Sequence, residues 1–152
     1  IFVGETINTP SMLCVEDAID GLKWAESIGG LKSLIERSKK NLKALESFVE
    51  KSNWLSFLCE DKATRSTTSV TVKISDPWYA GLNAEAQAKA LKDFTALLEK
   101  EAVAYDIGAY RDAPAGLRIW AGATVETSDL EALTPWLDWA WQQVKSTAAK
   151  AA

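Results

Sequence analysis

VAYDIGAYRDAPAGLRIWAGATVETSDLEALTPWLDWAWQQV, residues 103–144, is the stretch that decides the fold. Two short apolar runs, 103–107 and 117–121, predict two strands separated by a loop with turn-forming residues. Ser128-Asp129-Leu130-Glu131 is a capping box, which predicts that a long helix begins there. Strand, strand and helix in this order are typical of a small sheet that is covered by a helix.

The rest of the chain extends this pattern on the N-terminal side. Apolar residues at helical spacing or in short β-branched runs predict the other elements. They are helices at about 10–29, 31–51 and 84–100, with Thr9 as the N-cap of the first, and strands at 54–59 and 69–74. We therefore expect an α+β fold, in which a small antiparallel or mixed sheet has helices packed on one face.

Composition limits the classes of function. The 152 residues are 47% hydrophobic and carry a net charge of −4, so we expect one folded domain and no partner among nucleic acids or membranes. No apolar run approaches the ~20 residues that span a bilayer. Cys14 and Cys59 lie beside apolar residues, and we expect two buried thiols in a reducing compartment, the cytoplasm.

Catalytic patterns are missing from these residues. The chain contains no histidine, which excludes Ser-His-Asp triads, Cys-His dyads and His-rich metal sites within it. It has no glycine-rich phosphate loop, and none of its lysines has the apolar setting that lowers a pKa for Schiff-base chemistry. The sequence thus predicts no catalytic residue and no metal site here.

Gly4-Glu5-Thr6-Ile7-Asn8-Thr9-Pro10 has short polar side chains directly before a predicted helix. Unpaired N–H groups and the positive end of the helix dipole suit a phosphate group. Simple capping of the helix by Thr9 explains the same residues, and both interpretations stay open at this point.

Arg118 lies between Leu117 and Ile119 in an apolar strand. A buried guanidinium is costly unless an anion pairs with it, and its planar fork matches a carboxylate. An internal salt bridge, or an arginine on an edge strand that faces water, would explain the pattern equally well. Arg111 lies in the preceding loop, where plain exposure to solvent is the alternative to a binding role.

Three stretches resemble one family of enzymes. Residues 4–30, 63–70 (ATRSTTSV) and 105–140 are similar, in this order, to the C-terminal portion of phosphoserine aminotransferases. The resemblance implies the C-terminal small domain of a fold-type-I enzyme that depends on pyridoxal phosphate. It places residues 1–10 in a segment that leads in from a large N-terminal domain, and residues 11–152 in the small domain.

The resemblance also implies a reaction and roles for residues. A homodimer would transfer an amino group between glutamate and 3-phosphohydroxypyruvate in serine biosynthesis. Asn8 and Thr9 match the motif that reaches from one subunit to the cofactor phosphate of the other. Arg118 matches the arginine that binds the substrate α-carboxylate. Arg111 matches an arginine near the substrate phosphate, although many members have a histidine where this chain has Tyr110.

In that family the Schiff-base lysine, the aspartate at the pyridine nitrogen and the ring stacked on the cofactor all precede this portion. The resemblance therefore implies that this chain alone is inactive and binds pyridoxal phosphate weakly if at all.

Two other functions remain open from the sequence. One is an aminotransferase for another small acid, such as an alanine–glyoxylate type. The other is a non-catalytic α+β binding module whose partner surface would include Trp136, Trp139 and Trp141.

Overall fold

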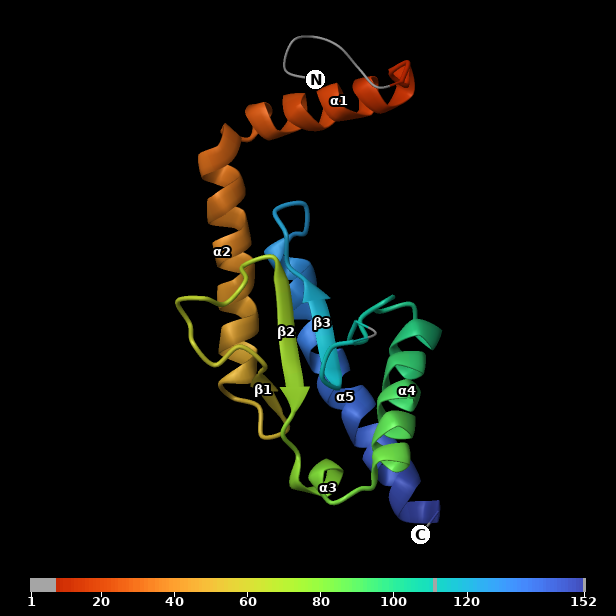
Figure 1. Cartoon of the computed structure of the whole chain (residues 1–152). Helices are drawn as coiled ribbons and strands as arrows, with labels where there is room; N and C mark the ends of the chain where they lie inside the picture. Colours follow the sequence, from red (N-terminus) through yellow and green to blue (C-terminus); the bar gives the residue numbers. More distant parts are fainter. Residues whose placement is uncertain (1–7, 111, 152) are drawn as a thin grey trace. The chain divides into compact units, whose positions relative to one another are not determined.

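The computed structural model describes residues 8–110 and 112–151 (Figure 1). Contacts along the backbone divide the chain into two compact units, Ile1–Glu36 and Arg37–Ala152. Among the described residues, no helix is both long and apolar enough to cross a membrane.

The first unit contains helix α1, Met12–Ser27. Its N-cap is Ser11, whose hydroxyl accepts a hydrogen bond from the Cys14 N–H, so the expectation that Thr9 caps this helix is wrong. Helix formation starts two residues later than predicted because Ser11, and not Thr9, is spaced to reach a free N–H of the first turn. Gly29 and Gly30, with φ angles of 107° and 68°, end the helix in a conformation that suits glycine.

The residues of α1 are all exposed or only partly buried. Cys14 is exposed and Cys59 is half-buried, both as free thiols, so the expectation of two buried thiols is wrong for Cys14. The exposed apolar side chains of this unit are Met12, Leu13, Val15, Ile19, Leu22, Trp24, Leu31 and Ile35.

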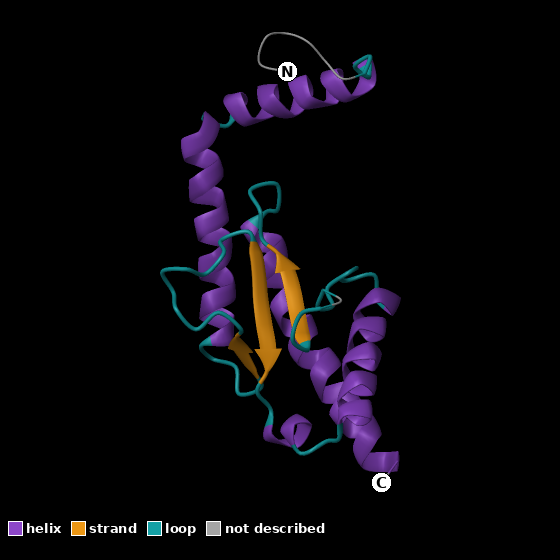
Figure 2. Cartoon of the chain, viewed as in Figure 1, coloured by secondary structure: helices purple, strands orange, loops and turns teal. Residues whose placement is uncertain are grey.

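The second unit is built on a three-stranded antiparallel sheet (Figure 2). Its strands are β1 (Leu55–Phe57), β2 (Ser69–Ile74) and β3 (Gly116–Trp120), in the order β1-β2-β3. Register is fixed by pairs such as Leu55 with Ile74 and Thr71 with Arg118. The predicted small antiparallel sheet is confirmed.

Four helices accompany the sheet: α2 (Gly30–Val49), α3 (Pro77–Ala80), α4 (Ala84–Lys100) and α5 (Thr127–Ala151). In Figure 2, α5 passes behind β2 and β3, the C-terminal half of α2 lies to the left of β2, and α4 lies alongside α5. The short helix α3 was not predicted from the sequence. It begins at Pro77, where the side chain of Asp76 accepts a hydrogen bond from the Trp78 N–H.

Aromatic rings form the centre of the core. Trp54 stacks on Trp141, with ring centroids 5.0 Å apart and an angle of 8° between the planes. Phe94 and Tyr79 meet the Trp141 ring edge-on. Because stacked and edge-to-face rings add to the free energy of burial, this cluster ties α3, α4 and α5 to the sheet.

The buried side chain of Asn41 joins α2 to the segment before α5. Its Nδ2 donates hydrogen bonds to the carbonyl oxygens of Ala121, Gly122 and Val125, and its Oδ1 accepts one from the Thr127 hydroxyl at 2.7 Å. Helix α5 begins at Thr127, one residue before the expected N-cap Ser128, which lies inside the helix and is exposed.

The predicted strand at 103–107 is wrong. Ala102 and Asp106 have positive φ angles of 56° and 50°, which interrupt an extended path. Only Gly108 pairs with the neighbouring strand, through a single bridge to Leu117. Residues 101–110 therefore form a loop, in which Ile107 and Gly108 contact the outer edge of β3.

Candidate functional site

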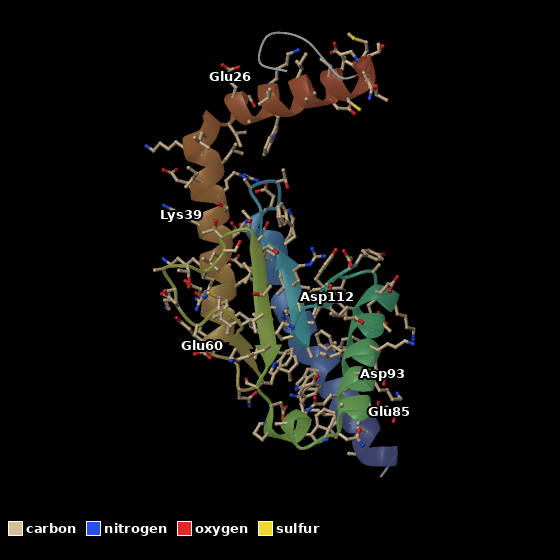
Figure 3. The ribbon with its side chains drawn as sticks, in the orientation of Figure 1. Glu26, Lys39, Glu60, Glu85, Asp93 and Asp112 are labelled. Carbon is tan, nitrogen blue, oxygen red and sulfur yellow. The ribbon has the colours of Figure 1, made fainter. Side chains whose placement is uncertain are left out.

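A hollow of about 420 Å³ lies at the outer edge of β3. The loop before β3 and the first turns of α5 form its other walls. Figure 3 labels Asp112, which lies in this loop shortly before β3 begins. The lining residues are Ser69, Ala104, Tyr105, Asp106, Ile107, Arg118, Ile119, Trp120, Val125, Leu130 and Leu133.

Gly116 places β3 against β2. A Cβ atom at this position would lie 2.1 Å from the Val72 carbonyl oxygen, so any other residue would push the strands apart. Two residues later, Arg118 lies opposite Thr71 at the centre of β3, where it lines the hollow. The close approach of the two backbones thus fixes where Arg118 sits.

The guanidinium of Arg118 is partly exposed and carries an ion pair. Its Nη2 lies 3.0 Å from Oδ2 of Asp106, and the side chains are 39% and 91% exposed. The two structural explanations raised by the sequence, a salt bridge and an edge strand, are thus both present. The guanidinium has five N–H donors, and this contact occupies one of them. The arrangement therefore has capacity to bind a further anion.

Asp106 is held beside Arg118 by the backbone that follows it. The Arg118 N–H donates a hydrogen bond to the Ile107 carbonyl oxygen at 2.9 Å, and Gly108 bridges to Leu117. The Ile107 side chain is buried. Sequence reasoning did not identify Asp106 as a site residue, because an aspartate in a positive-φ conformation inside an expected strand gives no recognisable signal.

The other expected site residues are distributed differently. Asn8 and Thr9 are exposed and belong to the first unit, whereas Arg118 belongs to the second. Arg111 lies outside the described residues. Two exposed aromatic residues that line the hollow, Tyr105 and Trp120, were not assigned a role from the sequence.

A second carboxylate, on Asp76, has the opposite environment. It is 5% exposed and accepts hydrogen bonds from Trp141 Nε1 at 2.9 Å, Lys145 Nζ at 2.8 Å and the Trp78 N–H at 2.8 Å. Burial by itself raises the pKa of Asp76, but the hydrogen bonds from Lys145, Trp141 and Trp78 outweigh it and lower the pKa below 3.8. This carboxylate joins α3 to α5. Its partners Trp78, Trp141 and Lys145 are residues of these helices and not of the hollow.

Exposed acidic residues elsewhere face solvent. In Figure 3, Glu85 and Asp93 lie on α4, and Glu60 lies in the loop after β1. Glu126 pairs with Arg37, whose hydrogen bond lowers the pKa of the carboxyl group. Within the residues that the structure describes, no group of three or more His, Cys, Asp or Glu side chains is arranged to hold a metal ion.

Comparison with known proteins gives a consistent result. The chain is 54% identical over 145 residues to the phosphoserine aminotransferase of Methanosarcina mazei, and equally to that of Methanosarcina barkeri. These alignments cover 95% of the chain, which spans only 36% of either relative's length. No model of a protein family matches the chain.

Two solved structures have the same fold. The phosphoserine aminotransferase of Bacillus circulans subsp. alkalophilus superposes with a TM-score of 0.73 at 21% identity, covering 90% of this chain and 34% of that one. A second phosphoserine aminotransferase, studied for radiation damage of its Schiff base, gives 0.71 at 18% identity. Sequence identity over nearly the whole chain and the shared fold agree: the chain is similar to about a third of the length of phosphoserine aminotransferases.

Proposed function

We propose that the chain is the C-terminal part of an enzyme that transfers an amino group between glutamate and 3-phosphohydroxypyruvate in serine biosynthesis. Residues 1–10 would lead in from a large domain, and 11–152 would form the small domain. The names of its relatives and its span of about a third of their length support this proposal. The enzyme would act in the cytoplasm as a homodimer.

One observation carries the proposal: Arg118 lines an open hollow and has donors left for an anion. A carboxylate bound by two parallel N–H groups is held in a fixed plane, which orients the substrate Cα. Every amino-acid and 2-oxo-acid substrate carries this carboxylate. Arg118 would therefore bind both substrates of the reaction in the same way.

Discrimination among substrates requires a second cation. Arg111, which follows Tyr110 in the sequence, is our candidate for binding the phosphate group of phosphoserine. A substrate with an anion at each end is then held at two points, and its reacting carbon is fixed between them. This assignment rests on the family resemblance and on the sequence.

Asn8 and Thr9 have the donors that a cofactor phosphate requires. Because the Ser11 hydroxyl caps α1, Thr9 is not needed for that role, and both side chains are exposed just before the helix. An amide and a hydroxyl next to a helix N-terminus fit the phosphate of pyridoxal phosphate. In the homodimer these residues would hold the cofactor of the partner subunit. The bound cofactor would supply the electron sink for transfer of the amino group.

The apolar residues of the first unit would meet the rest of the enzyme. Leu13, Leu22 and Leu31 are each at least 70% exposed, and together with the other exposed apolar side chains of this unit they offer apolar surface for contact with other protein. The large domain is the partner that we propose. The chain by itself would be inactive and would self-associate, which sedimentation across a concentration series would detect.

Two variants of the complete enzyme test the site. We expect Arg118→Ala to raise KM for phosphoserine and glutamate alike, by about 30-fold or more, because truncating one partner of a charge pair is costly. Arg111→Ala should raise KM for phosphoserine more than for glutamate. Unchanged KM values in a folded Arg118→Ala enzyme would show that this arginine is structural. Equal losses for both substrates in Arg111→Ala would show that Arg111 does not select for the phosphate group.

A further inference from the structure

We propose that Asp106 is a positioning residue, which holds the Arg118 guanidinium in the orientation that accepts a substrate carboxylate. This inference rests on the proposed carboxylate role of Arg118. It concerns a residue that neither the sequence pattern nor the relatives' names assign to the site.

The geometry of the contact leaves the binding fork intact. Asp106 Oδ2 meets Nη2 of Arg118 at 3.0 Å, through a single oxygen and a single nitrogen. A guanidinium offers two edges that each present two parallel N–H groups, and Nη2 contributes one hydrogen to each. Whichever hydrogen Asp106 accepts, the other edge keeps both of its N–H groups. A substrate carboxylate can therefore bind in bidentate fashion while Asp106 stays in place.

Asp106 itself is fixed by its neighbours. Its backbone has a φ angle of 50°, and the next residue, Ile107, is buried and accepts the backbone hydrogen bond of Arg118. The carboxylate therefore approaches Arg118 from a tethered position, although its side chain is 91% exposed. A free arginine side chain has many rotamers, and restricting them before the substrate arrives lowers the entropy cost of binding.

The negative charge of Asp106 does not make it a strong competitor for Arg118. Both side chains contact water, and exposed charges are screened by solvent and salt. The repulsion between Asp106 and an incoming carboxylate is thus weaker than in a buried site. The lower entropy cost of binding to a fixed guanidinium therefore outweighs this repulsion.

Two substitutions at residue 106 separate these effects. Glycine and asparagine both tolerate a φ angle near 50°, so neither strains the loop. Asp106→Gly removes the contact with Arg118, whereas Asp106→Asn keeps an acceptor oxygen and removes the charge. The comparison uses steady-state kinetics of the complete enzyme, with Glu99→Gln as a control that removes an exposed charge from α4.

We expect Asp106→Gly to raise KM for phosphoserine and glutamate by the same factor, about three- to tenfold, with little change in kcat. The separate variant Asp106→Asn should have a KM within about twofold of the wild type, since its side chain keeps an acceptor oxygen. Added to Arg118→Ala, the glycine substitution should have no further effect, because it acts through that guanidinium.

Several results would overturn the inference. They are a wild-type KM in Asp106→Gly, a lower KM in either variant, or equal impairment in both, since then the charge and not the orientation would matter. If Arg118→Ala impairs binding while Asp106→Gly does not, this inference alone fails. If Arg118→Ala also leaves KM unchanged, the proposed role of Arg118 fails with it.

Discussion

The carboxylates of Asp76 and Asp106 both pair with a cation, yet their surroundings differ in almost every respect. Asp76 is buried and accepts hydrogen bonds from the side chains of Trp141 and Lys145 and from the Trp78 N–H. Asp106 is exposed and meets Arg118 through one oxygen. Asp76 accepts three hydrogen bonds from the fold around it, whereas Asp106 occupies one donor of an arginine that has five.

This contrast separates structural charge from charge that can bind a ligand. Removing a partner of a saturated buried group leaves the remaining groups unpaired and destabilises the fold. Removing a partner of an exposed pair changes stability little, because water replaces it. Arg118 and Asp106 should therefore matter for substrate binding, and Asp76 for folding.

The largest expected effect is at Asp76. We expect Asp76→Ala to lower the free energy of unfolding by about 3 kcal/mol or more, because Lys145 and the Trp141 N–H lose a buried acceptor. Urea denaturation of the chain measures this. The control is Asp93→Ala, which breaks an exposed pair with Lys89 and should cost less than about 1 kcal/mol. Equal losses in both variants would contradict the contrast.

Asn41 gives the next largest effect. Its side chain makes four hydrogen bonds, to Ala121, Gly122, Val125 and Thr127, and is 1% exposed. We expect Asn41→Ala to cost about 2 kcal/mol, because buried carbonyl groups lose their donor. Lys39→Ala, on the exposed face of the same helix, serves as the control. A loss below about 0.5 kcal/mol would mean that water replaces the amide without cost.

Acid should remove the contribution of Asp76 with a defined sign. Its pKa in the folded chain is below the ordinary value of 3.8, so between these values the unfolded chain binds more protons. The stabilisation is complete above pH 3.8 and is lost as pH falls through the lowered pKa. The difference in unfolding free energy between wild type and Asp76→Asn should therefore shrink below pH 3.8. If the difference in unfolding free energy stays constant or grows below pH 3.8, the pKa of Asp76 is not lowered in the folded chain.

The smallest expected effect on stability is at Arg118. We expect Arg118→Ala to change the free energy of unfolding by less than about 1 kcal/mol, because its pair with Asp106 is exposed to water. The same urea experiment provides the value. A loss as large as that of Asp76→Ala would show that the scaffold depends on this arginine.

Much of the fold follows from the sequence because periodic apolar residues determine it. Residues 69–74 and 84–100 form the predicted strand and helix. The failures have local causes. Positive φ angles at Ala102 and Asp106 break a run that has strand composition, and Thr127, where α5 begins, bonds to Asn41, which is 86 residues away in sequence.

The site was predictable only in part for the same reason. Arg118 attracts notice because a charged residue in an apolar strand is costly. Asp106 does not, because its role depends on the path of the loop in space. The saturation of Asp76 likewise depends on Lys145, which is distant in sequence and lies next to it only after folding.

The most direct test of the central claim follows the visible absorbance of pyridoxal phosphate bound to the complete enzyme. Phosphoserine is added to one sample and alanine to another. The account predicts a rapid change of absorbance with phosphoserine and none with alanine, because only phosphoserine has anions at both ends for Arg118 and Arg111. A change with alanine and none with phosphoserine would contradict it.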